Sequence, residues 1–159
     1  MAILLNFETA ITGDSNVEKH EEWITLDSVS FNVNRTINAS GGGKSREVSN
    51  PMFGEVHCMK STDMASPEIM FQAIQGKSLG KAELHWVQTG AEGTTQVYYT
   101  LSLGNAIVSS YDISSAGDRP NEGFSISFDE IISQFDDFDG DAVSTGTPKG
   151  WNLVNNKQT

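Results

Sequence analysis

Hydrophobic and polar residues alternate along much of the chain, and a period of two is typical of β-strands. In one stretch Val29, Phe31 and Val33 alternate with serine and asparagine, which gives one apolar face and one small polar face. Residues 124–128 alternate in the same way, with phenylalanine and isoleucine against serine. We predict strands at residues 2–7, 22–37, 47–59, 79–89, 96–103, 106–114, 123–128 and 151–154.

One segment has the pattern of a helix instead. Ser66 is a favoured N-cap, Pro67 is favoured at the first helical position, and Gly76 suits a left-handed stop. The sequence therefore predicts one short α-helix over Pro67–Gln75. Many strands and one helix favour a mainly β fold, which we expect to be a compact β-barrel of two packed sheets with an extended glycine-rich loop. No internal repeat or linker divides the chain, so residues 1–159 are expected to form a single domain.

Two segments are poor in apolar residues and are expected to be loose. Residues 38–45 form a glycine-rich excursion between two strong strands, and residues 136–150 are rich in glycine and aspartate. Loops on a rigid scaffold often carry binding function. Composition alone leaves two readings open for the glycine-rich excursion, a binding loop or a plain surface hairpin.

The charge of the chain excludes several classes of partner. The 159 residues include 21 acidic and 10 basic side chains, which gives a net charge of −11. Binding to nucleic acid needs many phosphate contacts from lysine and arginine, so we expect no nucleic-acid partner. No apolar run approaches the length of about 18 residues that spans a bilayer, and residues 1–8 lack the basic start of a signal peptide. We therefore predict neither membrane insertion nor a cleaved signal.

Two motifs resemble ligand sites, and both are incomplete. Residues 41–45, Gly-Gly-Gly-Lys-Ser, resemble the end of a phosphate-binding loop, but Asn38 stands where a glycine is required and a strand pattern follows. Residues 136–141 resemble a calcium loop, but the matching register puts Phe135 and Gly146 at positions that need acidic ligands. A looser carboxylate site for a hard cation stays open at this turn, beside the alternative of a solvated acidic turn.

The remaining reactive residues do not form a recognisable catalytic set. His57 and Cys58 are neighbours in a predicted strand, so their side chains point to opposite faces and are poorly placed to share a metal. The sequence has no Gly-x-Ser-x-Gly elbow, and its lone cysteine excludes an intramolecular disulfide. We assign His57 and Cys58 buried or half-buried structural roles, and we predict no enzymatic activity, no cofactor and no metal.

A series of short motifs runs in order along almost the whole chain. They are Gly13-Asp14-Ser15, His20 to Ile24, the glycine-rich residues 38–45, Asp63-Met64-Ala65-Ser66-Pro67, Val108-Ser109-Ser110, the strand led by Glu122, and Gly150-Trp151-Asn152-Leu153. In this order and spacing they resemble the haemolysin-coregulated protein (Hcp) family, the tube subunit of bacterial type VI secretion systems. Two departures are Ala73, where the family often has cysteine, and Pro51, which interrupts a strand and is tolerated at edges and bulges.

The resemblance implies both a fold and a role. It implies a β-barrel with one helix, a homohexameric ring, and rings that stack into a tube inside a contractile sheath. It further implies contacts with sheath and spike components and with effector proteins, and no enzymatic activity. A subunit of this kind is assembled in the cytoplasm and secreted to the extracellular medium or a target cell without a signal peptide.

Within that reading, the glycine-rich loop is the expected contact between stacked rings. It carries basic residues in an acidic protein, and such residues should meet acids of a neighbour. The predicted contact residues are Asn38, Ser40, Gly41, Gly42, Gly43, Lys44 and Arg46.

The alternating strand would then form the wall of the tube, with Val29, Phe31 and Val33 in the core. Its polar residues are expected either to face the lumen or simply to face outside solvent; they are Ser28, Ser30 and Asn32. The competing class is a monomeric, calcium-assisted small-ligand or carbohydrate-binding β-module that uses residues 136–141.

Overall fold

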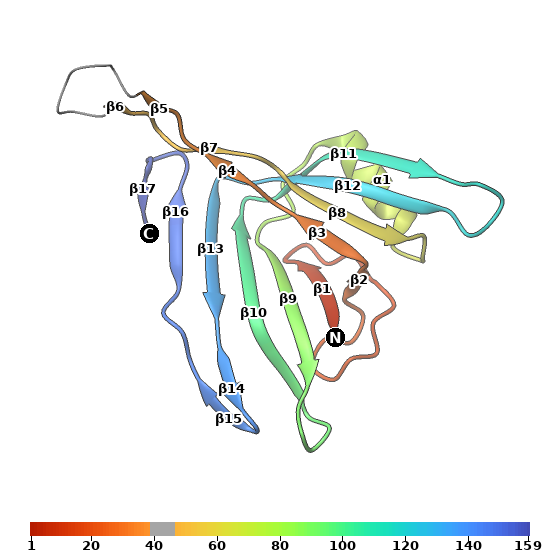
Figure 1. The fold of residues 1–159 in the computed structure, drawn as a ribbon. Coiled ribbons are helices and arrows are strands. Elements are labelled where there is room, and N and C mark those ends of the chain that lie inside the picture. The colour runs from red at the N-terminus through yellow and green to blue at the C-terminus, as the bar shows by residue number, and fades with distance from the viewer. Residues whose placement is uncertain (39–46) are drawn as a thin grey trace.

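A computed structural model describes residues 1–38 and 47–159, and two antiparallel sheets make up the body of the molecule (Figure 1). The larger sheet contains β1 (Ala2–Phe7), β2 (Ile24–Leu26), β9 (Ala82–Thr89), β10 (Thr95–Gly104), β13 (Glu130–Phe135), β16 (Lys149–Asn152) and β17 (Lys157–Gln158). Their order is β17-β16-β13-β10-β9-β1-β2. The smaller sheet contains β3 (Ser28–Ser30), β8 (Val56–Ser61), β11 (Ile107–Ser114) and β12 (Asn121–Ser127), in the order β11-β12-β8-β3.

The hydrophobic core lies between these sheets. Leu5 and Phe7 of β1 point into it from the larger sheet, while Val56 and Phe124 point into it from β8 and β12 of the smaller one. All four side chains are at most 1% exposed. The period of two seen in the sequence thus becomes an inner and an outer face in each sheet.

The mainly β class and the single helix of the described chain are confirmed, but the sheets do not close into the predicted barrel. The larger sheet ends at β17 and β2, and the smaller one ends at β11 and β3. One cause is visible in the segment 22–37, which was expected to be one strand. It is divided into short strands, so no single long strand bridges the two sheets.

The second half of that segment and the chain that returns to the body form an extended arm, which we define as the described residues 33–38 and 47–53 (Figure 1). Two short antiparallel ladders build it: β4 (Val33–Asn34) with β7 (Met52–Phe53), and β5 (Ile37–Asn38) with β6 (Glu47–Val48). Pro51 stands at the break before β7, as expected for a residue that cannot donate to a ladder. Asn38 ends β5, and the other predicted contact residues, Ser40, Gly41, Gly42, Gly43, Lys44 and Arg46, lie outside the described residues.

The helix α1 (Ser66–Gln75) begins one residue before the predicted start and ends as predicted. Gly76 has φ 67° and donates its N–H to Gln72 O, the left-handed stop that the sequence indicated. The N-cap prediction is wrong, because Ser66 is the first helical residue and Ala65 precedes it without a side-chain cap. No helix in the described parts of the chain has the length and apolarity needed to cross a membrane.

Residues 136–150 are more ordered than their composition predicted. They form a hairpin of β14 (Asp137–Asp139) and β15 (Ala142–Ser144), with Gly140 at φ 63° in the turn. The Asp136 carboxylate accepts the Gly146 N–H at 3.0 Å and so fixes the return of the chain. The physical reason is local hydrogen bonding between aspartate side chains and the backbone. A count of polar and apolar residues does not reveal such bonds.

Candidate functional site

The outer face of the four-stranded sheet carries mainly small polar side chains. Ser28 and Ser30 of β3 lie opposite Met59 and His57 of β8, and all four are exposed. The His57 Nδ1 atom lies 2.6 Å from Ser125 Oγ on β12, which continues the polar face across the sheet. Two of the three residues predicted to face a lumen therefore share one exposed surface.

The third of these residues, Asn32, lies at the root of the arm. Its backbone oxygen accepts the Gly54 N–H at 2.9 Å, and a Cβ on Gly54 would lie only 2.0 Å from Asn32 Oδ1. Asn32 is exposed, and its backbone and side chain lie against Gly54 on the returning chain. Its position is therefore tied to the exit of the arm, outside the regular face of β3.

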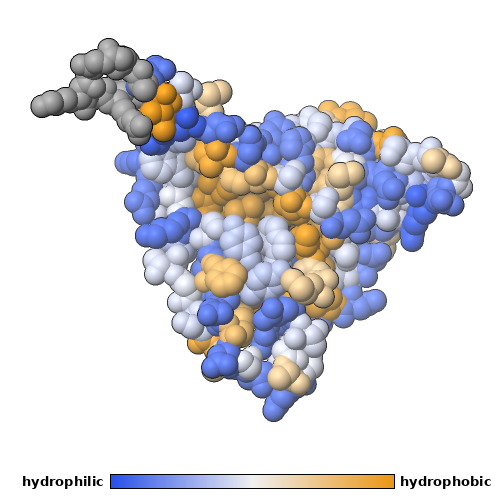
Figure 2. Space-filling model, viewed as in Figure 1, coloured by the Kyte–Doolittle hydropathy of each residue, from blue (hydrophilic) through white to orange (hydrophobic). Residues whose placement is uncertain are grey.

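The predicted apolar face of this strand is only partly correct. Val29 packs against the core, whereas Phe31 is 37% exposed and Val33 is 52% exposed. The prediction fails for these two because the strand stops at Ser30 and the chain then leaves the body. Figure 2 shows the apolar surface that gathers below the root of the arm. A groove of about 300 Å³ lies there, with Phe31 and Trp151 among its lining.

The arm exposes apolar side chains, and the sequence of residues 33–53 is basic. Ile37 and Val48 face each other across its outer ladder and are 55% and 52% exposed. Residues 33–53 hold Arg35, Lys44 and Arg46 but only one acid, a net charge of +2. Because the whole chain carries −11, the remainder must carry −13. The sequence therefore combines a basic stretch, residues 33–53, with a strongly acidic remainder.

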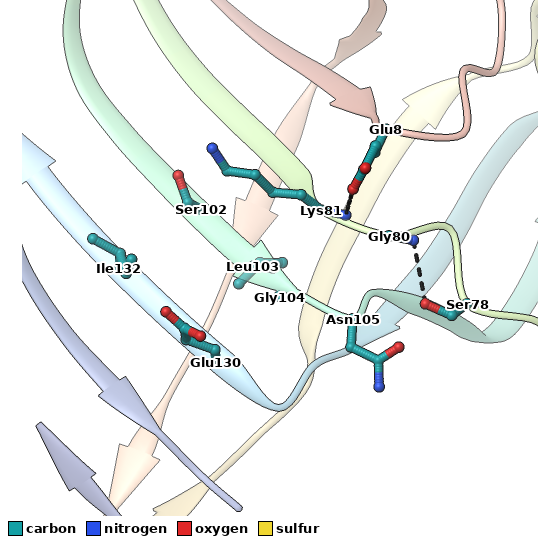
Figure 3. Close-up of a pocket in the computed structure, with 10 residues that line it drawn as sticks. All are labelled: Glu8, Ser78, Gly80, Lys81, Ser102, Leu103, Gly104, Asn105, Glu130 and Ile132. Carbon is teal, nitrogen blue, oxygen red and sulfur yellow. Dashed lines mark hydrogen bonds between the residues drawn. The ribbon is translucent and has the colours of Figure 1, made fainter. Parts of the chain in front are cut away.

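A pocket of about 430 Å³ lies on the outer face of the larger sheet (Figure 3). Glu8 Oε2 accepts the Lys81 N–H at 3.0 Å there, while the Lys81 ammonium pairs with Glu83. Gly80 has φ 74°, a conformation that favours glycine, and a Cβ there would lie 2.5 Å from Glu8 Oε2. The described lining residues contain neither histidine nor cysteine. The pocket offers polar and charged contacts.

A buried cluster of polar side chains joins the start of α1 to the smaller sheet. Lys60 on β8 and Glu122 on β12 are register partners and are 2% and 1% exposed. The Lys60 ammonium donates to Glu122 Oε1 at 2.5 Å and to Asp63 Oδ1 at 2.8 Å. Ser66 donates to the same Glu122 oxygen at 2.7 Å. Charges this deeply buried are tolerated because each has a partner.

The second oxygen of Glu122 is also occupied. Tyr111 on β11 donates its hydroxyl to Oε2 at 2.5 Å. Burial raises the pKa of Tyr111, and the hydrogen bond to Glu122 raises it further. Asp63 Oδ1 in turn accepts the Ala65 N–H at 2.9 Å. The carboxylate thus satisfies a backbone donor at the start of the helix, which the alanine side chain could not do. The motif residues Asp63, Ser66 and Glu122 are thus parts of one internal anchor.

The structure tests the predicted roles of His57 and Cys58. They do point to opposite faces: Cys58 is 1% exposed, whereas His57 lies on the exposed polar face. The buried role is confirmed for Cys58, whose pKa is raised by burial, and it is wrong for His57. Sequence reasoning missed another pair, because His20 Nε2 and His85 Nδ1 lie 2.8 Å apart. Among the described residues, no three His, Cys, Asp or Glu side chains gather as metal ligands.

The chain matches a known protein family and, over a shorter stretch, a curated protein. The family described as "Type VI secretion system effector, Hcp" matches residues 4–135. The chain belongs to this family. Over 49 residues it is 41% identical to the "Major exported protein" of Pseudomonas aeruginosa, a match that spans 31% of this chain and 28% of that protein.

Solved structures with a similar fold include two Hcp proteins. A "type six secretion system protein" is 21% identical, with 99% of both chains covered and a TM-score of 0.89. Hcp1 from Salmonella typhimurium is 20% identical, with 99% of this chain and 98% of that chain covered and a TM-score of 0.74. Hcp3 from Pseudomonas aeruginosa is 22% identical, with 95% and 97% covered and a TM-score of 0.62. The Hcp fold therefore extends over almost the whole chain.

Proposed function

We propose that this chain is a structural subunit of the type VI secretion inner tube, which forms hexameric rings that stack, carry effectors and are themselves secreted. The observation that carries the proposal is the arm, an extension with exposed apolar side chains on the acidic body of an Hcp-family protein. The proposed role of the chain is structural rather than catalytic. Its expected partners are further copies of the chain, sheath and spike components, and effector proteins.

The physical argument starts from the stability of the arm. A two-stranded ribbon is at best marginally stable in water, and this one leaves Ile37 and Val48 more than half exposed. Packing against another surface would bury those side chains. The body of a second copy is the fitting surface, because its excess negative charge complements the basic stretch of residues 33–53. Contact between an arm and a body joins unlike surfaces, and such heterologous contacts generate rings or open stacks.

The outer face of the smaller sheet fits the wall of a conduit. Ser28 and Ser30 offer short, uncharged side chains there, beside the longer Met59 and His57. We therefore assign this face to the lumen and the arm to contacts between rings. Assembly in the cytoplasm followed by expulsion through the machine would export the chain without a cleaved signal.

The native mass of the full-length chain tests this proposal. Light scattering after size exclusion should give six times the chain mass of 17.3 kDa. Reversing Lys44 and Arg46 together to glutamate should preserve the ring and shorten the stacks seen by electron microscopy, since the arm would then repel an acidic body. A monomer would contradict the proposal. A monomer whose melting temperature rises with calcium would instead support the calcium-assisted β-module.

A further inference from the structure

The helix α1 carries apolar side chains on two faces. Ile69 faces the core and is 0% exposed, but three apolar residues lie on the side that faces solvent. We call these three the helix face; Met70 is 45% exposed, Phe71 is 47% exposed and Ile74 is 72% exposed. A surface helix normally turns polar residues to water, and a helix that is apolar all round is normally buried. The helix face therefore lacks a cover in the chain that the structure describes.

The groove below the root of the arm is a second apolar surface without a cover. Leu101 and Ile131 belong to the core and also line the groove, so the groove opens directly onto the core. Trp151 on β16 is the register partner of Ile131 and widens the apolar lining. The larger sheet has seven strands and the smaller one has four, so the smaller sheet is too narrow to cover all of the larger one.

A chain cannot cover its own groove with its own helix. Figure 1 shows α1 beside β11 on one side of the body, with β13 and β16 on the other. The internal anchor fixes the helix there, since Ser66 in its first turn donates to the buried Glu122. The cover for the groove must therefore come from another molecule.

The charges identify a second copy of the chain as a fitting cover. Glu68 is the only charged residue of α1, and Lys149 is the only charged residue among the described lining of the groove. Both side chains are exposed, and neither takes part in a salt bridge within the described residues. An acidic surface would repel Glu68, whereas the groove combines apolar contact with one opposite charge.

The two surfaces also suit a repeated contact. The helix face and the groove are unlike surfaces on opposite sides of one body, so a contact between them is heterologous. Heterologous contacts that close on themselves form rings. In a closed ring every helix face and every groove is covered, whereas an isolated pair of copies leaves one of each exposed to water.

We propose that the helix face of one copy packs into the groove of the next copy, and that this contact joins neighbours within a ring. The inference rests on the proposed function, which supplies the ring, and it leaves the arm for contacts between rings. Burial of the helix face provides the favourable free energy. The attraction between Glu68 and Lys149 favours the correct pairing of surfaces over other apolar contacts.

Ile74→Gln tests the apolar part of the contact. Glutamine is polar, uncharged and a good helix former, and Ile74 is 72% exposed, so the chain should stay folded by circular dichroism. Sedimentation over a dilution series should show half-dissociation of the ring at a concentration at least about tenfold higher, because a buried isoleucine is lost from every contact. The matched control is Val143→Gln on β15, where Val143 is 56% exposed, and it should dissociate like the unaltered protein.

An exchange of charges tests whether the two surfaces meet. Glu68→Lys and Lys149→Glu should each weaken the ring, because each variant places like charges at the contact. The chain that carries both substitutions should assemble more tightly than either single variant, since opposite charges then face each other again. Both positions are exposed, so these variants do not disturb the core. Failure of the double variant to recover would overturn the placement of the helix face in the groove.

The outcomes separate this contact from the proposed function. A monomeric unaltered protein would contradict the proposed function, and the contact would fall with it. An unaltered hexamer that Ile74→Gln leaves unchanged would overturn the contact alone. A variant that still forms the ring but is no longer secreted would place the helix face against another component of the machine, which would also overturn the contact.

Discussion

Glu122 and Ile37 lie in strands of the same molecule but have opposite surroundings. Glu122 is charged, 1% exposed, and accepts hydrogen bonds at both carboxylate oxygens. Ile37 is apolar, 55% exposed, and has only the short ladder of the arm beside it. Both residues depart from the usual pattern of apolar side chains inside and charged side chains outside, but in opposite directions. A polar group inside fixes the fold, whereas an apolar group outside is available for association.

Breaking the internal anchor should have the largest effect. Glu122→Ala removes the partner of Lys60, Ser66 and Tyr111 and leaves a lysine charge buried without its nearest acid. We expect a loss of about 3–5 kcal/mol in the free energy of unfolding, measured by urea denaturation. The matched control is Glu55→Ala on an exposed position, which should cost less than about 1 kcal/mol. Equal losses in the two variants would show that the cluster is not an anchor.

A smaller change to the same anchor is Tyr111→Phe. It removes one donor from Glu122 and should cost about 1–3 kcal/mol near neutral pH, because a buried acceptor loses its partner. Since the folded state raises the pKa of Tyr111, the unfolded chain gives up this proton first as the pH rises above about 10. The unaltered protein should therefore lose stability there more steeply than Tyr111→Phe. Parallel curves of stability against alkaline pH would contradict this role.

Changes to the arm should leave stability almost untouched. Ile37→Ser with Val48→Ser removes two exposed apolar side chains, so the free energy of unfolding of the separated chain should change by less than about 0.5 kcal/mol per site. Assembly into larger species should nevertheless fall sharply in light scattering. Ile113→Ser is the matched control, because Ile113 is 57% exposed on β11, away from the arm. A comparable loss of assembly in the control would remove the special role of the arm.

The regular part of the fold could be predicted from hydrophobic patterning. Residues 2–7 form the predicted strand, and the helix end at Gly76 is as expected. The missed strand β13 lies in the middle of the larger sheet, and it has two adjacent isoleucines, Ile131 and Ile132, in place of alternation. Ile131 faces the core and Ile132 lines the outer pocket, so both faces of this strand meet apolar surroundings.

The candidate sites were predictable only where they depend on one strand. The exposed positions of Ser28 and Ser30 follow from a period of two, but the exit of the chain after Ser30 does not. Pairings between distant segments were invisible, since His20 and His85 are separated by 65 positions and Lys60 and Glu122 by 62. Nothing in a single sequence marks two such residues as neighbours, although the motif containing Glu122 marked it as a position of interest.

The burial of Cys58 has a consequence for the chemical integrity of an exported protein. A chain that leaves the reducing cytosol meets oxidants outside, where exposed thiols are converted to disulfides or sulfenic acid. Such reactions need an accessible thiolate, but Cys58 is 1% exposed and its pKa is raised by burial. The thiol is therefore protected in both compartments. On the proposed route of export, the same covalent molecule would therefore leave the cell without cross-links between copies.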